Sequence, residues 1–280
     1  MLFRLPVLSR SVLSDPPEPG EGVGDAAAAK TELIVARFFL SKKNIQGDSA
    51  TVAGPEFEHM RKVLHLGPGD RVTLFDNEGW EHEGIIRSFT NGQGEIKIVN
   101  SCRPERESSV RITLAQAVGK GDKLDWIVEK ATELGVAAIA PFLCKRTVPK
   151  LDGAAREKRA LRWQRIALSA AKQSGRVRVP EILGVMDFFD LVRRPWPCDL
   201  KLIFWEKETA RGLARLREDT SSVDSLLIVI GPEGGFTSDE VAEAERSGFQ
   251  SVRMGKRILR TETAAVTALS LAQFLWGDLG

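Results

Sequence analysis

Beyond residue 110 the hydrophobic positions follow two alternating patterns, short β-prone runs and longer stretches with a helical period. Residues 111–117 and 226–230 have strand length, and the second run is unbroken, as in a parallel strand buried on both faces. Apolar residues between 124 and 134 recur at three- and four-residue steps and stop at Gly135, which predicts an amphipathic helix with a glycine at its end. Further strands are predicted at residues 136–142 and 200–204, and a long helix over residues 152–174. This alternation predicts an α/β fold.

Residues 34–101 show a different pattern, in which short β-like runs are separated by turn signals. The run at residues 71–75 follows Leu66-Gly67-Pro68-Gly69-Asp70 and precedes Asp76-Asn77-Glu78-Gly79. These features predict a small β-barrel or β-sheet domain of roughly 70 residues, with one helix around residues 56–64. The charged stretch at residues 102–109 is the expected linker between the two domains.

The first 31 residues fit neither pattern. Residues 1–14 are apolar with two arginines, three serines and no acid, which is reminiscent of an organelle transit peptide. Residues 15–22 are rich in proline, glycine and acids, which is typical of a disordered tail or an over-extended start. We favour the second interpretation. The chain is therefore divided into a disordered extension (1–31), a β domain (32–104) and an α/β domain (105–280).

Composition narrows the class of protein but does not identify a partner. The chain is 42% hydrophobic and 28% charged, as in ordinary globular proteins, and its net charge of +2 gives no argument for nucleic acid. Three isolated cysteines suit reduced thiols in a cytosolic protein, and the three histidines lack the spacing of a metal site, so we expect no metal. No apolar run reaches the roughly 20 residues of a membrane span.

A basic cluster between residues 145 and 178 is hidden by the small net charge. It contains eleven cations and two acids. Four arginines recur at every third position of the expected helix and form a stripe that can follow a phosphate backbone: Arg156, Arg159, Arg162 and Arg165. A solvated helix face is the alternative, but such a face usually carries interspersed acids. We therefore favour RNA as the partner of this cluster.

The densest motif begins where the strand 226–230 ends, in Gly231-Pro232-Glu233-Gly234-Gly235. Thr237 and Glu240 then form a capping box, so a helix starts at once. A glycine-rich turn at the carboxyl end of a strand is where open α/β sheets bind ligands. The negative charge of Glu233 and the lack of a lysine argue against a phosphate cradle. A tight turn that binds nothing is the alternative.

A second glycine-anchored segment, residues 254–264, runs directly into a final apolar helix at residues 265–276. Thr261 and Thr263 are both candidate N-caps of that helix. An apolar Ile258-Leu259 pair between charged residues is unusual for a surface loop, and indicates contact with a bound ligand. An ordinary strand-to-helix connection is the alternative. Two such loops at one sheet edge predict a pocket.

These two motifs together closely resemble the RsmE family of SPOUT-class methyltransferases, which methylate N3 of a uridine in small-subunit ribosomal RNA. The resemblance covers most of residues 36–276 and departs at His65, where the family pattern has arginine. Further matches, each weak alone but strong in this order, are Arg37-Phe38-Phe39, His59 with Val63-Leu64, Leu66 and Pro68-Gly69-Asp70, Lys120-Gly121-Asp122-Lys123, Glu129 to Gly135, Arg162-Trp163 and Gln173-Ser174-Gly175-Arg176.

The resemblance implies a PUA-like RNA-binding β-barrel at residues 32–104 and a trefoil-knotted α/β methyltransferase domain at residues 105–280. It also implies a cytoplasmic homodimer that binds S-adenosyl-L-methionine in the knot and acts on 16S ribosomal RNA. Periodicity predicts none of this, and general topology rules argue against knots. The cofactor residues carried over by motif are Ile230, Gly231, Glu233, Gly234, Gly235, Met254, Gly255, Ile258, Leu259 and Arg260.

Methylation at N3 requires loss of the N3 proton and in-line delivery of the methyl group to an unpaired or flipped base. We expect Arg260 to stabilise negative charge on the uracil oxygens, and Glu233 to orient the substrate or act as a base. The structural alternatives are an Arg260–Glu262 pair and a Glu233 that caps the adjacent helix. The expected RNA-binding residues are Arg37, Lys120, Lys123, Arg146, Arg156, Arg159, Arg162, Arg165, Lys172 and Arg176, although Lys120 and Lys123 could be solvated lysines.

Two other functions remain open from the sequence alone. A non-catalytic RNA-binding or ribosome-assembly protein could use the β domain and the arginine stripe, but it would leave the two-loop pocket unexplained. A methyltransferase that acts on transfer RNA would share all of these motifs. The sequence does not specify the modified nucleotide, nor whether free RNA or the assembled subunit is the substrate.

Overall fold

The computed structural model describes residues 36–280 apart from 149–150, 214, 217–219 and 221. These residues belong to one compact unit that spans Val35–Gly280. The predicted disordered extension, residues 1–31, lies outside the described residues, as does Lys150 of the basic cluster. No helix in the described ranges is both long and apolar enough to cross a bilayer.

The amino-terminal part is built on a six-stranded sheet in the order β1-β4-β5-β6-β3-β2. All of its pairs are antiparallel except β1 with β4. Alternate residues of the strands bury Phe38, Val52 and Ile96 in a common core. The strands are β1 (Arg37–Phe39), β2 (Ile45–Gln46), β3 (Ser49–Ala53), β4 (Arg71–Phe75), β5 (Glu81–Thr90) and β6 (Gln93–Cys102).

A short helical segment adds Phe57 and Met60 to this core. It consists of α1 (Gly54–Glu58) and a single π-helical turn (His59–Val63), and it confirms the helix predicted around residues 56–64. A 3-10 turn at Lys42–Asn44, which the sequence pattern did not predict, joins β1 to β2. Strands β5 and β6 form a long hairpin around Asn91-Gly92, both with positive φ, as tight hairpin turns require.

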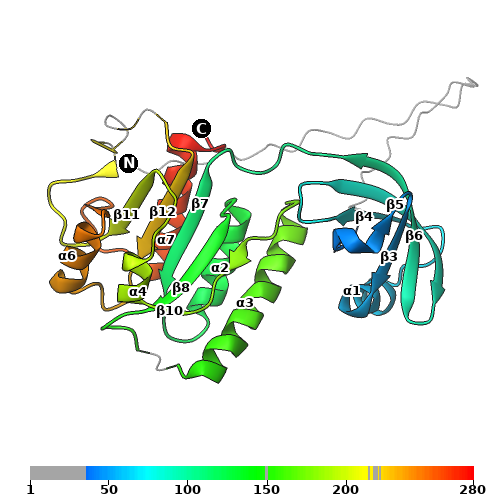
Figure 1. Ribbon diagram of the computed structural model, residues 1–280, viewed down its shortest axis with the longest axis horizontal. Helices are drawn as coiled ribbons and strands as arrows, with labels where there is room; N and C mark the ends of the chain where they lie inside the picture. Colours follow the sequence, from blue (N-terminus) through cyan, green and yellow to red (C-terminus); the bar gives the residue numbers. More distant parts are fainter. Residues whose placement is uncertain (1–35, 149–150, 214, 217–219, 221) are drawn as a thin grey trace, which may run out of the picture. The chain divides into compact units, whose positions relative to one another are not determined.

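The carboxyl-terminal part is an α/β domain with a parallel sheet in the order β10-β8-β7-β12-β11-β13, with β9 also paired to β8 (Figure 1). Every strand pair in it is parallel. The buried strands read as nearly continuous apolar runs because helices cover both faces. The strands are β7 (Arg111–Ala117), β8 (Ala138–Leu143), β9 (Glu181–Ile182), β10 (Met186–Asp187), β11 (Leu200–Phe204), β12 (Ser225–Ile230) and β13 (Gln250–Val252).

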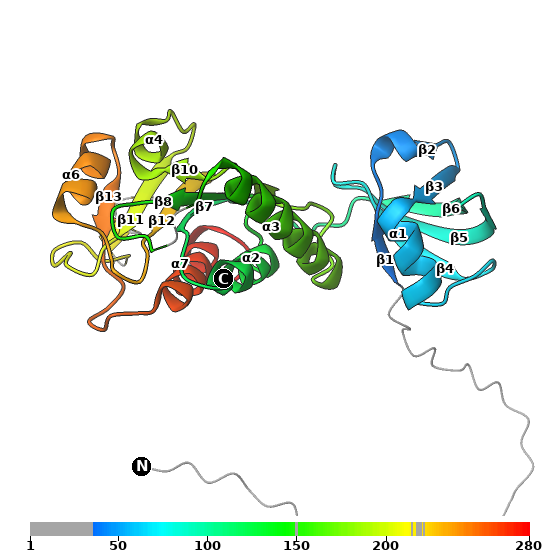
Figure 2. The same ribbon diagram turned by 90° about the horizontal axis from the view of Figure 1, so that it is seen from below.

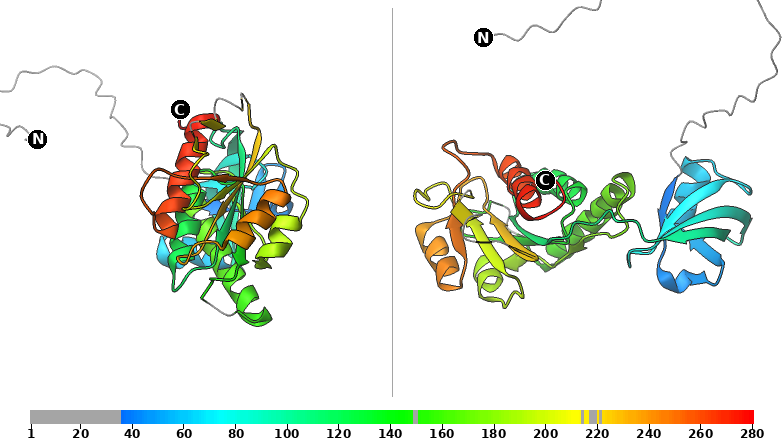
Figure 3. Two further views of the ribbon diagram at one scale, coloured as in Figure 1. Left: turned by 90° about the vertical axis from the view of Figure 1, so that its left-hand side faces the viewer. Right: turned by 90° about the horizontal axis from the view of Figure 1, so that it is seen from above.

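Two groups of helices sandwich this sheet. Helices α2, α3 and α7 pack on one face and α4 and α6 on the other (Figure 2), each group with its own apolar core. The same layers are seen along the sheet in the left view of Figure 3, with α7 in red on one side and α6 in orange on the other. The helices are α2 (Lys123–Glu133), α3 (Gly153–Gln173), α4 (Phe188–Arg193), α6 (Ser238–Arg246) and α7 (Thr261–Trp276).

Most helix ends follow from their local sequence. Gly135 follows α2 with a φ of 78°, a left-handed conformation that favours glycine. The side chain of Asp152 caps α3 by accepting a hydrogen bond from Ala155 N at 2.8 Å. Thr237 and Glu240 form the predicted capping box at the start of α6. The alternation of strands and helices predicted from the sequence is therefore confirmed.

Candidate active site

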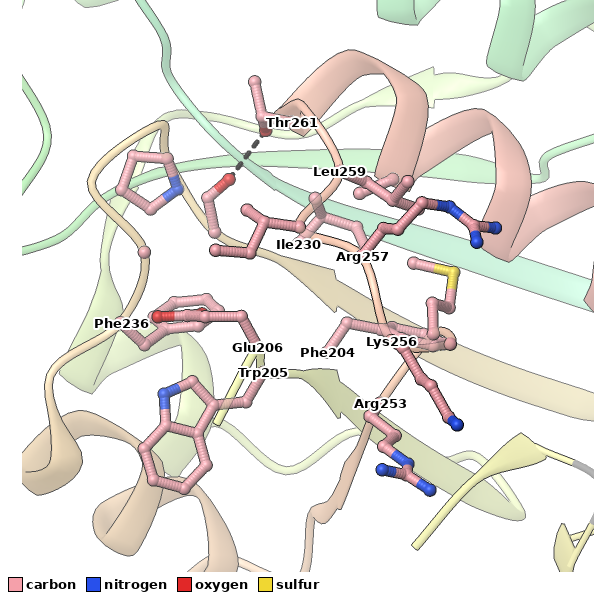
Figure 4. A pocket seen from close by; sticks show the side chains of 17 residues that line it. Phe204, Trp205, Glu206, Ile230, Phe236, Arg253, Lys256, Arg257, Leu259 and Thr261 are labelled. Atoms are coloured by element: carbon pink, nitrogen blue, oxygen red, sulfur yellow. Dashed lines mark hydrogen bonds between the residues drawn. The ribbon is translucent and has the colours of Figure 1, made fainter. Parts of the chain in front are cut away.

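Two loops at the carboxyl edge of the parallel sheet form one pocket (Figure 4). The first follows β12 and runs through Gly231–Phe236, and the second follows β13 and leads into α7. Seven of the ten residues predicted to bind the cofactor line this pocket: Ile230, Gly231, Gly235, Met254, Gly255, Ile258 and Leu259. Glu233, Gly234 and Arg260 belong to the same loops but do not line it.

The first loop requires glycine at two positions. A Cβ at Gly231 would lie 2.9 Å from the ring of Phe236, which is buried and stacks on Phe142. Gly235 has a φ of 66°, and a Cβ there would lie 2.7 Å from Oε1 of Glu206. The loop therefore passes closer to its neighbours than any side chain would allow, and it leaves an open cradle at the strand end.

A buried polar network ties the two loops together. Thr261 Oγ1 donates to the carbonyl oxygen of Gly231 at 2.7 Å, the dashed line in Figure 4. Thr261 Oγ1 also accepts a hydrogen bond from Gln116 Nε2 at 2.9 Å. The prediction that Thr261 or Thr263 caps the last helix was wrong: α7 starts at Thr261, Arg260 holds the N-cap position, and no side chain caps the helix. The Thr261 hydroxyl instead forms hydrogen bonds with Gly231 of the first loop and with Gln116.

A charged cluster lies beside the pocket, where the amino terminus of α2 meets both loops. Lys123 Nζ is 2.8 Å from Oε1 of Glu233 and 3.7 Å from Oε2 of Glu262. Oε1 of Glu233 also accepts a hydrogen bond from the backbone N–H of Lys120 at 3.3 Å. Arg260 is exposed and close enough for its charge to act on Lys123.

This cluster bears on the two structural alternatives considered for Glu233 and Arg260. Glu262 interacts with Lys123, and no ion pair joins it to Arg260 within the described ranges. Glu233 contacts the start of α2 and not that of α6, where Glu240 makes the cap. Both structural alternatives drawn from the sequence are therefore replaced by a Lys123-centred network.

The ionisation of Glu233 follows from these contacts. Partial burial by itself raises the pKa of the Glu233 carboxyl, but the hydrogen bonds from Lys123 and the Lys120 backbone outweigh burial and hold this pKa below its usual value. The same hydrogen bond raises the pKa of Lys123. Glu233 is consequently a carboxylate at neutral pH and a weak proton acceptor.

A third wall of the pocket comes from the end of β11, where Phe204, Trp205 and Glu206 line it. The sequence pattern predicts strand 200–204 but points to no function for the residues after it. Because β11 is parallel to β12, its carboxyl end lies at the same edge of the sheet. That rule, applied to β11 as it was to β12, would have identified Glu206.

Six of the ten cations predicted to bind RNA form ion pairs with acidic side chains. Lys172 interacts with Glu56 at 2.9 Å, and Arg37 with Glu81. Arg156 pairs with Asp187, and Arg162 with Asp122 and Asp125. Lys123 and Arg176 complete the six. Four of these six belong to the basic cluster of residues 145–178, which is therefore less positive in three dimensions than in the sequence: Arg156, Arg162, Lys172 and Arg176.

Arg176 is the clearest departure from the expected RNA contacts. Its side chain is only 6% exposed, and its NH1 donates to the carbonyl oxygens of Thr132 and Val136, both at 2.9 Å. Its Nε and NH2 donate to Oε2 of Glu107 at 3.1 and 2.6 Å. Because this guanidinium is buried and its donors are used within the chain, we expect its role to be structural, and the predicted RNA contact of Arg176 stays a prediction.

Four of the predicted cations remain without an acidic partner among the described residues. Arg159 and Arg165 lie on α3, and Lys120 lies before α2. Arg146 NH1 donates to the carbonyl oxygen of Gly234 at 2.8 Å, so it supports the first loop of the pocket from outside. The predicted RNA contacts of these four residues stay predictions.

The lining of the pocket suits an adenosyl group. Phe204, Ile230, Met254 and Leu259 offer an apolar floor for a flat ring, and the loop backbone supplies hydrogen-bonding groups. The glycine cradle lets a ligand approach that backbone closely. Elsewhere in the described ranges, no three His, Cys, Asp or Glu side chains gather as metal ligands do.

Comparisons with known proteins agree with this site. Residues 106–273 match the family model of an RNA methyltransferase domain. Ribosomal RNA small subunit methyltransferase E of Bacillus subtilis is 34% identical over 245 residues, which are 85% of this chain and 96% of that protein. Ribosomal RNA small subunit methyltransferase E of Neisseria gonorrhoeae, solved with bound S-adenosyl methionine, is 34% identical with a TM-score of 0.78, covering 88% of this chain and 100% of that one.

A methyltransferase of Legionella pneumophila, solved with bound S-adenosylmethionine, is 31% identical with a TM-score of 0.80, over 88% of this chain and 99% of that one. The fold and the two-loop pocket thus define an RNA methyltransferase. More narrowly, the chain belongs to the family of ribosomal RNA small subunit methyltransferase E. The resemblance drawn from its two glycine-anchored loops is confirmed.

Proposed function

We propose that the protein transfers a methyl group from S-adenosyl-L-methionine to N3 of a uridine in small-subunit (16S) ribosomal RNA. One observation carries this proposal: the two glycine-anchored loops meet at one sheet edge, joined by Thr261, around an apolar floor that suits an adenosyl group. Relatives that match most of the chain are named as methyltransferases of small-subunit ribosomal RNA.

The chain's own residues divide the work in this proposal. S-adenosylmethionine supplies an electrophilic methyl group when bound. The two loops orient it, and Arg260, exposed beside the pocket, stabilises negative charge on the uracil oxygens. Glu233 is held by Lys123 as a carboxylate of lowered pKa, so in this proposal it orients the substrate by accepting a hydrogen bond, and the N3 proton passes to solvent water.

Three measurements test this function. Isothermal titration calorimetry should show saturable binding of S-adenosylmethionine, and purified protein with labelled cofactor should methylate 16S ribosomal RNA or the small subunit. Mass spectrometry of digested product should locate the label on N3 of a uridine. An absence of cofactor binding would favour a non-catalytic RNA-binding protein, and a label that appears only on transfer RNA would refute the proposed substrate. Free RNA and assembled subunits, assayed in parallel, show which form is modified.

The finer architecture belongs to the same proposal. We assign residues 32–104 to a PUA-like RNA-binding barrel, supported by the six-stranded sheet, and residues 105–280 to a trefoil-knotted methyltransferase domain. The contacts of Thr261 with Gly231 and Gln116 join three distant segments beside the pocket, and the knot itself is carried by the resemblance to the family. Because ribosomal RNA is the substrate, we place the enzyme in the cytoplasm.

We further propose that the enzyme is a homodimer. Helices α2 and α7 lie side by side and leave large apolar side chains exposed, with Trp126 at 44%, Phe274 at 55% and Leu271 at 36%. A second copy of this chain would cover these side chains. It would also cover Ile258, which is 84% exposed on the second loop of the pocket. A monomer mass in light scattering at micromolar concentration would rule this assembly out.

The two arginines of α3 that have no acidic partner among the described residues, Arg159 and Arg165, are expected to contact RNA. We expect the double variant Arg159→Ala, Arg165→Ala to bind a 16S RNA fragment more weakly. The slope of log K against log salt concentration (the salt slope) should decrease in magnitude by about one unit for each phosphate that is no longer neutralised. Fluorescence anisotropy at several salt concentrations measures both quantities. Arg246→Ala is the matched control, because Arg246 lies on α6 and already pairs with Glu243. An unchanged salt slope in the double variant would show that this stripe does not meet the backbone.

A further inference from the structure

Glu206 is the one acidic side chain that lines the pocket formed by the described residues. It follows directly after β11, and its carboxylate lies against Gly235 of the first loop. The basic lining residues, Arg253, Lys256 and Arg257, belong to the second loop. Figure 4 shows Glu206 beside Phe236, across the pocket from Arg253 and Lys256. The two sides of the pocket therefore differ in charge.

The carboxylate of Glu206 has no hydrogen-bond or ion-pair partner among the described residues. Its neighbour Trp205 has a buried indole N–H that also lacks a partner in the described ranges. By contrast, Glu233, which lies on the first loop, forms an ion pair with Lys123. Glu206 is exposed, so its carboxylate is free to accept hydrogen bonds from a ligand in the pocket, and the buried indole N–H of Trp205 is a donor that a ligand could satisfy.

We propose that Glu206 binds the ribose of the cofactor, with its carboxylate accepting hydrogen bonds from the 2′- and 3′-hydroxyl groups. The inference rests on the proposed function, since it takes S-adenosylmethionine as the ligand. An acidic residue just after a parallel strand is a general solution for binding ribose hydroxyls, because its two oxygens match two neighbouring donors.

The position of Glu206 selects the ribose over the other parts of the cofactor. Phe204, two positions earlier, contributes to the apolar floor that suits the adenine. The ribose is bonded directly to adenine, so a residue next to that floor meets the ribose first. The carboxylate end of the methionine moiety is expected on the opposite side of the pocket, where Arg253, Lys256 and Arg257 supply positive charge.

The test compares ligands that share the ribose but not the amino acid. Glu206→Gln keeps the size of the side chain and removes its charge. We expect it to weaken S-adenosylmethionine and 5′-methylthioadenosine equally, by about 10- to 100-fold each, as calorimetry measures. The wild type should prefer 5′-methylthioadenosine over its 2′,3′-dideoxy analogue by a similar factor, and the variant should lose most of that preference. In turnover, KM for the cofactor rises while kcat at saturation is retained.

Control variants separate binding from folding. Glu83→Gln removes an exposed carboxylate from β5 and should change neither affinity nor Tm. Glu206→Asp retains the charge on a shorter side chain and should bind with intermediate affinity, at a Tm equal to that of the wild type. If Glu206→Gln weakens S-adenosylmethionine but not 5′-methylthioadenosine, the carboxylate contacts the ammonium group and the inference is overturned.

The inference can also fail separately from the proposed function. Wild-type protein that binds S-adenosylmethionine and methylates RNA, together with unchanged affinities in Glu206→Gln, would overturn the ribose contact alone. Wild-type protein that binds no S-adenosylmethionine would overturn the proposed function, and the ribose contact with it.

Discussion

Arg260→Ala is expected to lower kcat by about 100-fold while the Kd of S-adenosylmethionine changes by less than about twofold. Arg260 is exposed at the start of α7 and does not line the pocket, so its side chain is not required for holding the cofactor. Its guanidinium lies near Lys123 at the edge of the pocket, where a base brought up to the methyl donor would develop negative charge. A fixed cation at that place stabilises the transition state more than the ground state.

Single-turnover methylation at saturating cofactor measures this effect without interference from product release. Arg260→Lys should restore part of the rate, since it returns a cation with a different geometry. Arg246→Ala removes an exposed arginine from α6 and should retain the full rate. Arg260→Ala with normal cofactor affinity and an unchanged single-turnover rate would eliminate the proposed role of Arg260.

The structure confirms the elements that depend on local sequence. The bounds of β7 and β11 match the predicted strands at both ends, and the capping box of Thr237 with Glu240 lies where the sequence placed it. Such signals need only the residues within one or two turns, because periodicity and capping are short-range properties. The same reasoning placed the glycine-rich turn at the end of β12, which is now part of the pocket.

Thr261 shows why a local rule can fail at a functional site. A threonine before an apolar helix is a good N-cap candidate, yet its hydroxyl bonds to Gly231 and Gln116. These partners are 30 and 145 residues away in the chain. Only the strand order, which places β12 next to β7, brings them together. Tertiary hydrogen bonds of this kind have no signature in the neighbouring sequence.

The RNA contacts predicted from the basic cluster are limited by the same lack of tertiary information. Counting charges between residues 145 and 178 could not detect that Lys172 would meet Glu56, or Arg176 Glu107, across 116 and 69 residues. Charge counting assumes that each cation faces solvent, which holds for Arg165 and fails for Arg176. Predicting RNA contacts therefore needs the fold first, because burial and pairing decide which charges are available.

Arg176→Met is expected to lower the free energy of unfolding by about 3–5 kcal/mol, which makes it the largest stability effect predicted for this chain. The substitution removes the Arg176 donor from the buried carbonyl oxygens of Thr132 and Val136, although Thr132 O still accepts a hydrogen bond from the N–H of Gly135. Glu107 still accepts hydrogen bonds from the backbone N–H groups of Val177 and Arg178, but it loses its only cationic partner among the described residues. Denaturant unfolding followed by circular dichroism measures the decrease.

Two further variants distinguish a structural Arg176 from an RNA-binding one. Arg176→Met with Glu107→Leu removes both charges, so it should recover part of the stability and reveal the coupling between the two side chains. Arg165→Ala should change the free energy of unfolding by less than about 0.5 kcal/mol, because that residue is exposed and has no acidic partner among the described residues. If Arg176→Met were as stable as the wild type and bound RNA more weakly, the sequence-based role would be correct and the structural one wrong. A large decrease in stability with Arg176→Met, beside a decrease in RNA affinity with Arg165→Ala, would show that one run of basic residues serves two separate purposes.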